Sequence, residues 1–235
     1  MANDGAAIFD LDGTLLDSLD VWEKVDRDFL ARRGLTVPSD YSDAVAAMSF
    51  GEAARYTADR FGFPDSPAEL IREWNGMVAS EYAHNIGLKP GARELLSALS
   101  RRGIRLGVAT ALPEELYGPA LRNNGIHGLF GAFASVPEAA RGKGSPDLYL
   151  LCARRLGVSP ARCVVFEDML PGLRGAKAAG MAAFGVFDSR SPLRERDARS
   201  AADGYLRNLS ELLEPGRLDA LFPPRPGAES APPSR

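Results

Sequence analysis

Two aspartates, Asp10 and Asp12, directly follow a short apolar run near the start of the chain. The run has the length and composition of a strand buried on both faces. Side chains two residues apart on extended backbone point the same way, so both carboxylates can face one pocket beyond the strand. Carboxylates this close repel each other unless a cation or a shared proton lies between them. The stretch therefore indicates either a charged site of this kind or, more simply, one aspartate that ends a strand and another that caps a turn.

Further polar residues follow later predicted strands, namely Thr110, Lys143 and the pair Glu167-Asp168. Each has an ordinary structural explanation when it is taken alone: a threonine that ends a strand, a solvated loop lysine, and acids favoured near a helix N-terminus. Strands and helices alternate in this part of the chain, which predicts parallel strands whose carboxyl ends share one edge of a sheet. The presence of all of these residues at one edge favours a common site.

The chemistry that suits this set of residues is phosphoryl transfer. A carboxylate can attack phosphorus to form an aspartyl-phosphate, and a second acid can protonate the leaving oxygen and later activate water. Mg²⁺ suits carboxylate and phosphate oxygens and brings the two negative groups together. A lysine and a hydroxyl can hold the phosphoryl oxygens as charge redistributes. The sequence contains a candidate for every one of these parts.

The elements that must position these residues divide the chain into a core and an insertion. Helices are predicted at 18–33, 51–61, 67–84, 91–102, 113–123, 146–156 and 171–180, and later strands at 104–110, 132–136, 163–166 and 182–187. This order predicts an α/β fold, with a Rossmann-like doubly wound parallel sheet formed by residues 1–16 and 89–222. Residues 17–88 are expected to form an inserted all-helical cap domain, and the proline-rich tail 223–235 is expected to be disordered.

Composition narrows the classes of partner and location. The net charge of -3 gives no reason to expect nucleic acid or an anionic membrane as a partner. No apolar run reaches the roughly 18 residues that span a bilayer, and the N-terminus lacks the regions of a signal peptide. Cys152 and Cys163 show neither metal-ligand spacing nor a disulfide framework. A cytoplasmic monomer that acts on a small molecule is the expectation.

The motifs in their order resemble the haloacid dehalogenase superfamily, in particular the β-phosphoglucomutase-like phosphatases with a small helical cap. The resemblance covers about residues 6–190 and is specific as a set. The residues that carry it are Phe9-Asp10-Leu11-Asp12-Gly13-Thr14-Leu15-Leu16-Asp17-Ser18, Val108-Ala109-Thr110, Gly142-Lys143 and Phe166-Glu167-Asp168.

This resemblance implies a role for each candidate in catalysis. Asp10 would be the nucleophile and Asp12 the general acid and base. Thr110 and Lys143 would bind the phosphoryl group, and Lys143 would also offset the charge of Asp10. Many relatives have asparagine where this chain has Ala111, so only the backbone N–H of Ala111 is left to bind phosphate.

The resemblance also implies a Mg²⁺ site. Asp10 would be a metal ligand through its side chain and Asp12 through its backbone carbonyl. Asp168 would complete the site, with Glu167 beside it or acting through water. A glycine follows Lys143 where relatives commonly have proline, which loosens the loop and leaves the charge.

Single positions then separate the subclasses of the superfamily. Asp12 argues against dehalogenases and phosphonatases, which lack the second acid. Sugar phosphomutases typically have a histidine where Trp22 stands and a cap arginine where Phe50 stands, and that arginine helps to hold a second phosphate. We therefore expect a Mg²⁺-dependent phosphatase for a small sugar or polyol phosphate, with Trp22 and Phe50 near the substrate. A β-phosphoglucomutase-like phosphomutase remains the alternative.

Overall fold

The computed structural model describes residues 4–46, 48, 50–139 and 141–223, with the side chains of residues 43, 46 and 50 left out. The proline-rich tail predicted at 223–235 lies, after its first residue, outside the described residues. The chain forms two compact units. Residues 19–86 form the smaller unit, and the segments on either side of them form the larger one.

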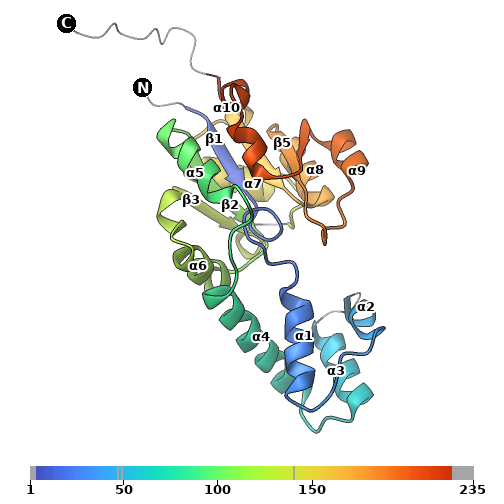
Figure 1. Cartoon of the computed structure of the whole chain (residues 1–235). Helices are drawn as coiled ribbons and strands as arrows, with labels where there is room; N and C mark the ends of the chain where they lie inside the picture. The colour runs from blue at the N-terminus through green and yellow to red at the C-terminus, as the bar shows by residue number, and fades with distance from the viewer. Residues whose placement is uncertain (1–3, 47, 49, 140, 224–235) are drawn as a thin grey trace, which may run out of the picture. The chain divides into compact units, whose positions relative to one another are not determined.

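The larger unit is built on a six-stranded sheet in which every neighbouring pair of strands is parallel (Figure 1). The spatial order is β3-β2-β1-β4-β5-β6. The strands are β1 (Ala6–Phe9), β2 (Arg105–Thr110), β3 (Ala132–Ser135), β4 (Cys163–Glu167), β5 (Ala182–Val186) and β6 (Gly204–Leu206). The predicted Rossmann-like fold class is confirmed. In this strand order the direction of winding reverses between β1 and β4, and ligands of such sheets bind beyond the carboxyl ends of the strands at that point.

Helices cover both faces of the sheet, and its strands are therefore buried. On one face, Ile8 and Val165 belong to an apolar cluster that includes Cys152 and Leu173 of the covering helices. On the other face, the ring of Phe9 stacks on that of Phe166 with 4.8 Å between centroids. The helices of this unit are α5 (Ala92–Arg101), α6 (Glu114–Asn123), α7 (Asp147–Leu156), α8 (Leu170–Ala178), α9 (Glu195–Ala201) and α10 (Arg217–Leu221), with 3-10 turns η1 (His127–Leu129), η2 (Val136–Glu138), η3 (Pro160–Arg162) and η4 (Leu209–Leu213).

The smaller unit is helical and has an apolar core of its own. Its helices are α1 (Val21–Ala31), α2 (Tyr41–Ala46), α3 (Phe50–Phe61) and α4 (Pro67–His84). Phe29 of α1 packs edge-on against Trp74 of α4, with 5.5 Å between ring centroids. A capping box between Ser66 and Glu69 starts α4, with a proline in the first turn. Helix α1 ends before Gly34, whose φ of 73° suits a glycine after a helix.

The two segments that connect the units pair with each other. The N–H of Asp17 donates to the carbonyl oxygen of Gly87 at 3.0 Å, and the N–H of Lys89 donates to that of Leu15 at 2.9 Å. Leu16 and Leu88 form an antiparallel bridge between them. These segments are therefore held by backbone hydrogen bonds, and the boundary between the units falls just beyond them, at 18/19 and 86/87.

Besides the short helix α10 and the 3-10 turns, the structure adds three further elements that the sequence pattern did not predict. β6 is three residues long, too short for an alternating pattern to show. In α9, most residues are polar and Ala198 is the buried one, so no apolar stripe marks the helix. Helix α2 has six residues, below the length at which helical periodicity can be recognised.

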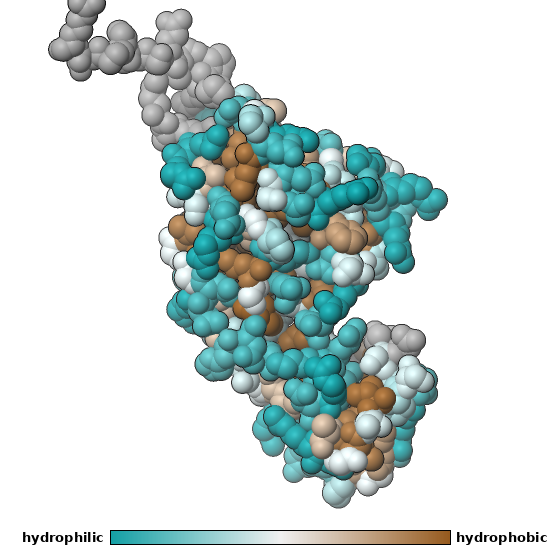
Figure 2. All heavy atoms as spheres, viewed as in Figure 1, coloured by the Kyte–Doolittle hydropathy of each residue, from teal (hydrophilic) through white to brown (hydrophobic). Residues whose placement is uncertain are grey.

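One face of the described surface can be followed in Figure 2. In the view of Figure 2, hydrophilic residues predominate and apolar residues form separate patches. Among the described residues, no helix is long and apolar enough to cross a lipid bilayer.

Candidate active site

Asp10 lies at the end of β1, at the centre of the sheet and beside the point where its winding reverses. Its backbone N–H donates to the carbonyl oxygen of Phe166 at 3.0 Å, so the pairing between β1 and β4 continues one residue beyond the strand. Asp10 is 3% exposed. The sheet therefore fixes the backbone of Asp10 and places its carboxylate beside the end of β4.

Lys143 joins the carboxylates of β1 and β4. Its Nζ lies 2.5 Å from Oδ1 of Asp10 and 2.9 Å from Oε1 of Glu167, and its side chain is only 12% exposed. The lysine stands in the loop before α7, so three chain segments distant in sequence meet at one ammonium group. Burial would lower the pKa of Lys143, but Asp10 and Glu167 raise it well above its usual value, and the side chain stays charged.

Glu167 is fully buried and is held on several sides. Its Oε1 accepts a hydrogen bond from the hydroxyl of Tyr149 at 2.8 Å as well as the contact from Lys143. Gly172, in the first turn of α8, leaves the room for this carboxylate, because a Cβ at that position would lie 2.5 Å from Oε2. Real Cβ atoms essentially never approach another heavy atom closer than 3.0 Å. The orientation of Glu167 thus depends on α7, α8 and the Lys143 loop together.

The loop that carries Lys143 packs directly on α8. A Cβ at Gly175 would overlap the carbonyl oxygen of Lys143 and would lie 2.9 Å from that of Ser145. Within the loop, the N–H of Ser145 donates to the carbonyl oxygen of Gly142 at 2.9 Å. A glycine in α8 therefore lets the helix approach the backbone of this loop and fix the base of the lysine side chain.

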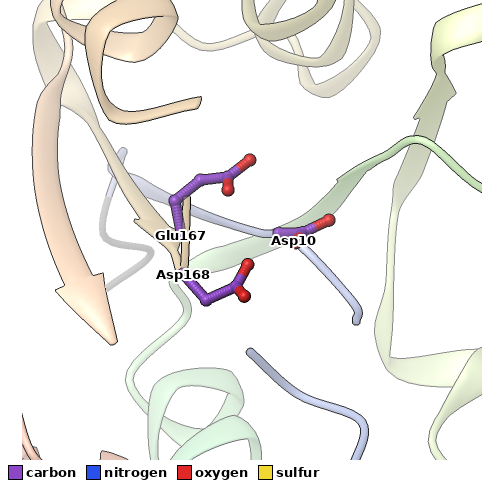
Figure 3. Close-up of side chains that lie close together, drawn as sticks. All are labelled: Asp10, Glu167 and Asp168. Atoms are coloured by element: carbon purple, nitrogen blue, oxygen red, sulfur yellow. The ribbon is translucent and has the colours of Figure 1, made fainter. Parts of the chain in front are cut away.

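Asp10, Glu167 and Asp168 together form a candidate metal centre (Figure 3). One carboxylate oxygen from each can be chosen so that all lie within 4.8 Å of one another. Oε2 of Glu167 is buried and has no hydrogen-bond partner within the described part of the chain. Hard carboxylate oxygens are the ligands that Mg²⁺ prefers. The donor set and the unpartnered oxygen fit a divalent cation.

The electrostatics of the cluster agree with this fit. Burial raises the pKa of Glu167 to about 7; Lys143 opposes the rise and Asp10 adds to it. Burial also raises the pKa of Asp168 to about 8, with the Asp10 and Glu167 carboxylates adding to the effect. The ammonium of Lys143 pairs with Asp10 and Glu167, and the buried carboxylate of Asp168 adds a third negative group beside them, so a further cation is favoured there.

Asp12 lies in a tight loop after β1, and the alternation expected for a strand does not extend to it. The backbone turns at this point, because the N–H groups of both Leu15 and Leu16 donate to the carbonyl oxygen of Leu11. Asp12 is partly buried, and its Oδ1 accepts a hydrogen bond from the hydroxyl of Ser18 at 2.6 Å. The loop, more than the strand, sets the direction of the Asp12 carboxylate.

Thr110 ends β2, the strand next to β1, and is buried. Its Oγ1 accepts a hydrogen bond from the N–H of Leu112 at 3.1 Å, which leaves the hydroxyl hydrogen able to donate. Ala111 is exposed between them. The structure therefore places Thr110 at the same sheet edge as Asp10, and its binding of phosphate remains a prediction.

The two residues expected near the substrate belong to the smaller unit. Trp22 stands in the first turn of α1 and is 42% exposed. The side chain of Phe50 lies outside the described residues, so the expectation for it stays a prediction.

Sequence reasoning missed the residues that hold the carboxylates in place. Tyr149 reads as one apolar position of a helix, and its hydroxyl contact to Glu167 spans 18 residues of sequence. Ser191, whose hydroxyl donates to the backbone carbonyl of Asp168 at 2.5 Å, lies in a segment with no motif. The closely spaced glycines Gly172 and Gly175 were the available signal, since glycine inside a helix marks a close approach when it is not a cap.

Comparison with known proteins shows the family to which the chain belongs. A family model described as haloacid dehalogenase-like hydrolase matches residues 5–180. The chain belongs to the haloacid dehalogenase-like hydrolase family. Members of this family generally use a divalent metal ion, which fits the acidic centre.

Named relatives within the family are similar along most of the chain. Hexitol phosphatase B of Escherichia coli K12 is 30% identical over 88% of this chain and 93% of its own length. Fructose-1-phosphate phosphatase YqaB of the same strain is 32% identical over 76% of this chain and 94% of its own. The crystal structure of a putative β-phosphoglucomutase from Thermotoga maritima superposes with a TM-score of 0.81, at 25% identity, covering 89% of this chain and 97% of that one.

Proposed function

We propose that this protein is a Mg²⁺-dependent phosphatase that hydrolyses a small phosphorylated sugar or polyol through an aspartyl-phosphate. The observation that carries the proposal is the buried Asp10 carboxylate, ion-paired with Lys143 and grouped with Glu167 and Asp168 at the centre of the sheet edge. The names of the hexitol and fructose-1-phosphate phosphatases, both similar along most of the chain, support the class of substrate.

In the first step, a carboxylate oxygen of Asp10 attacks phosphorus while the bond from phosphorus to the ester oxygen breaks. Asp12 gives a proton to that oxygen, so the sugar or polyol leaves as an alcohol. In the second step Asp12 takes a proton from water, and the water oxygen displaces Asp10 from phosphorus. The products are the alcohol and inorganic phosphate, and both aspartates return to their starting states.

Other residues of the chain bind the phosphoryl group as its charge redistributes. The ammonium of Lys143, 2.5 Å from the attacking carboxylate, can hold a phosphoryl oxygen and reduce the repulsion between two negative groups. The hydroxyl of Thr110 and the backbone N–H of Ala111 would donate to the other oxygens. These groups are fixed by the sheet and by the Lys143 loop before substrate arrives, which favours the transition state.

A metal ion would be held by the side chains of Asp10, Asp168 and Glu167, the last directly or through water, with the backbone carbonyl of Asp12 as a further ligand. When bound, Mg²⁺ supplies positive charge that neutralises carboxylate and phosphate oxygens. We further propose that the helical unit acts as the cap that selects the ester, with Trp22 and Phe50 near the substrate. The proposal also includes a monomer in the cytoplasm.

The test is a panel of sugar and polyol phosphates, with released inorganic phosphate and the organic product both measured. We expect release of phosphate in Mg²⁺, loss of activity in EDTA and weak support by Ca²⁺, whose longer and more variable bonds suit this compact centre poorly. Asp10→Asn should lower turnover by about 10³-fold or more, because an amide cannot form the acyl-phosphate. An isomeric sugar phosphate without net phosphate release would instead identify a mutase, and near-normal turnover by Asp10→Asn would exclude Asp10 as nucleophile.

A further inference from the structure

Lys89 is a nearly buried lysine at the same sheet edge, with no part in the chemistry proposed above. Its side chain is 12% exposed, and that of its partner Asp188 is 6% exposed. Its Nζ donates to Oδ2 of Asp188 at 2.7 Å and to the carbonyl oxygens of Phe187 and Gly13, each at 2.8 Å. These three acceptors match the three N–H donors of an ammonium group.

One end of this contact is anchored to the sheet. Asp188 and Phe187 follow β5, and the N–H of Phe187 donates to the carbonyl oxygen of Leu206 in β6 at 2.8 Å. The second oxygen of Asp188 accepts the backbone N–H of Arg190 at 2.9 Å. Both carboxylate oxygens are therefore engaged, and the segment that receives the lysine is held by the strands beside it.

The other end of the contact is the loop that carries Asp12. Gly13 directly follows Asp12, has a φ of 70°, and donates its N–H to the carbonyl oxygen of Leu16 at 3.0 Å. Lys89 also holds this loop through its own backbone N–H, which donates to the carbonyl oxygen of Leu15. The loop is thus attached to Lys89 at two points, and one of them is the residue next to the proposed acid and base.

We propose that Lys89 is a positioning residue for the acid/base step, fixing the backbone that carries Asp12 against the segment after β5. The proposal rests on the proposed function, in which Asp12 protonates the leaving oxygen. A charge buried this far must keep its partners, so the lysine makes one arrangement of the loop strongly favoured. Proton transfer depends on distance and direction, and it loses efficiency when the loop is free to shift.

The nature of the leaving group provides a readout that a purely structural role would not move. A sugar or polyol leaves as a poor alkoxide unless it is protonated, whereas p-nitrophenolate leaves without a proton. In both cases kcat/KM reports the steps up to the departure of the leaving group. A misplaced Asp12 therefore lowers kcat/KM for the alkyl ester and spares that for p-nitrophenyl phosphate.

The test variant is the double substitution Lys89→Met/Asp188→Asn, which removes both charges and leaves no buried charge unpaired. Both esters are assayed with Mg²⁺ saturating for each variant, so that a shift of the Asp12 backbone carbonyl, a proposed metal ligand, does not lower occupancy of the metal site. We expect kcat/KM for the best alkyl phosphate of the panel to fall by about 10-fold or more, and that for p-nitrophenyl phosphate to change by less than about 3-fold. The control is Lys177→Met/Asp203→Asn, which removes an ion pair at 2.8 Å elsewhere in the same unit. Asp203, like Asp188, also accepts a backbone N–H, here from Ala183.

The selective loss, absent from the control, supports the positioning role. An equal loss for both esters, or no loss for either, overturns it, and thermal unfolding of both double variants identifies a general loss of stability. If the wild-type protein releases phosphate from neither ester, the proposed function fails, and this inference fails with it. That result appears before any variant is made, so the two failures are distinguishable.

Discussion

Gly172→Ala tests whether helix α8 shapes the pocket of Glu167. In an ordinary helix, replacing glycine by alanine stabilises the protein by about 0.5–1 kcal/mol. Here the new Cβ would lie 2.5 Å from Oε2 of Glu167, below the 3.0 Å limit that real Cβ atoms keep. The Cδ and Oε1 atoms of Glu167 would lie closer still, so the carboxylate or the helix must move by more than half an ångström.

The magnitude follows from what the carboxylate would lose. Its distance to Nζ of Lys143 is 2.9 Å, and its distance to the hydroxyl of Tyr149 is 2.8 Å. A shift of half an ångström can lengthen the first to about 3.4 Å, outside the usual hydrogen-bond range. Overpacking costs about 1–3 kcal/mol, so after the helix gain we expect net destabilisation of about 1–2 kcal/mol. Because Glu167 is a proposed metal ligand, its displacement should also weaken Mg²⁺ binding by about 10-fold or more.

The assay for Gly172→Ala combines urea denaturation with Mg²⁺ titration by calorimetry. Gly76→Ala is the matched control, because Gly76 lies within helix α4 and a Cβ there has no atom within 4 Å. The control should raise stability by up to about 1 kcal/mol and leave Mg²⁺ binding unchanged. A Gly172→Ala variant as stable as the wild type and with equal Mg²⁺ affinity would refute the reasoning.

Two further predictions concern buried charge. Lys143→Met leaves the carboxylates of Asp10 and Glu167 without their ammonium, so without Mg²⁺ we expect the free energy of unfolding to fall by about 3 kcal/mol. Adding Mg²⁺ should then raise the Tm of this variant by more than it raises that of the wild type. An equal Mg²⁺-induced rise in Tm for the variant and the wild type would contradict this prediction. Burial raises the pKa of Asp26 to about 6, although the Ser42 hydrogen bond lowers it. The folded state therefore loses stability as the pH rises from about 4 to about 6, where the carboxyl ionises in the unfolded chain before it does in the folded one. Measured by urea denaturation, Asp26→Asn should raise the free energy of unfolding by about 1 kcal/mol near pH 8 and by almost nothing below pH 4. The gain is small because solvent screens a half-buried group. An equal gain at both pH values would contradict this prediction.

The sequence by itself determined five of the six strands of the sheet and the order of strands and helices along the chain. An apolar strand followed by Asp10 and alternating strands and helices predict one edge where the polar residues meet, because parallel strands in a doubly wound sheet share the direction of their carboxyl ends. These signals are local: they depend on residue type and on spacing within one element. The predicted strand near 132–136 was found at Ala132–Ser135, and the helix at 67–84 was found with those limits.

Only the tertiary structure decided how the side chains of the site are held. Tyr149 reaches Glu167 across 18 positions, and Lys89 reaches Asp188 across 99. Such contacts leave no periodic trace, because each partner is an ordinary residue in its own segment and the pair forms only when packing brings the segments together. Gly172 shows a related limit: a glycine inside a helix can signal a close approach, but only the tertiary structure identifies Glu167 as the group that fills the space of the missing Cβ.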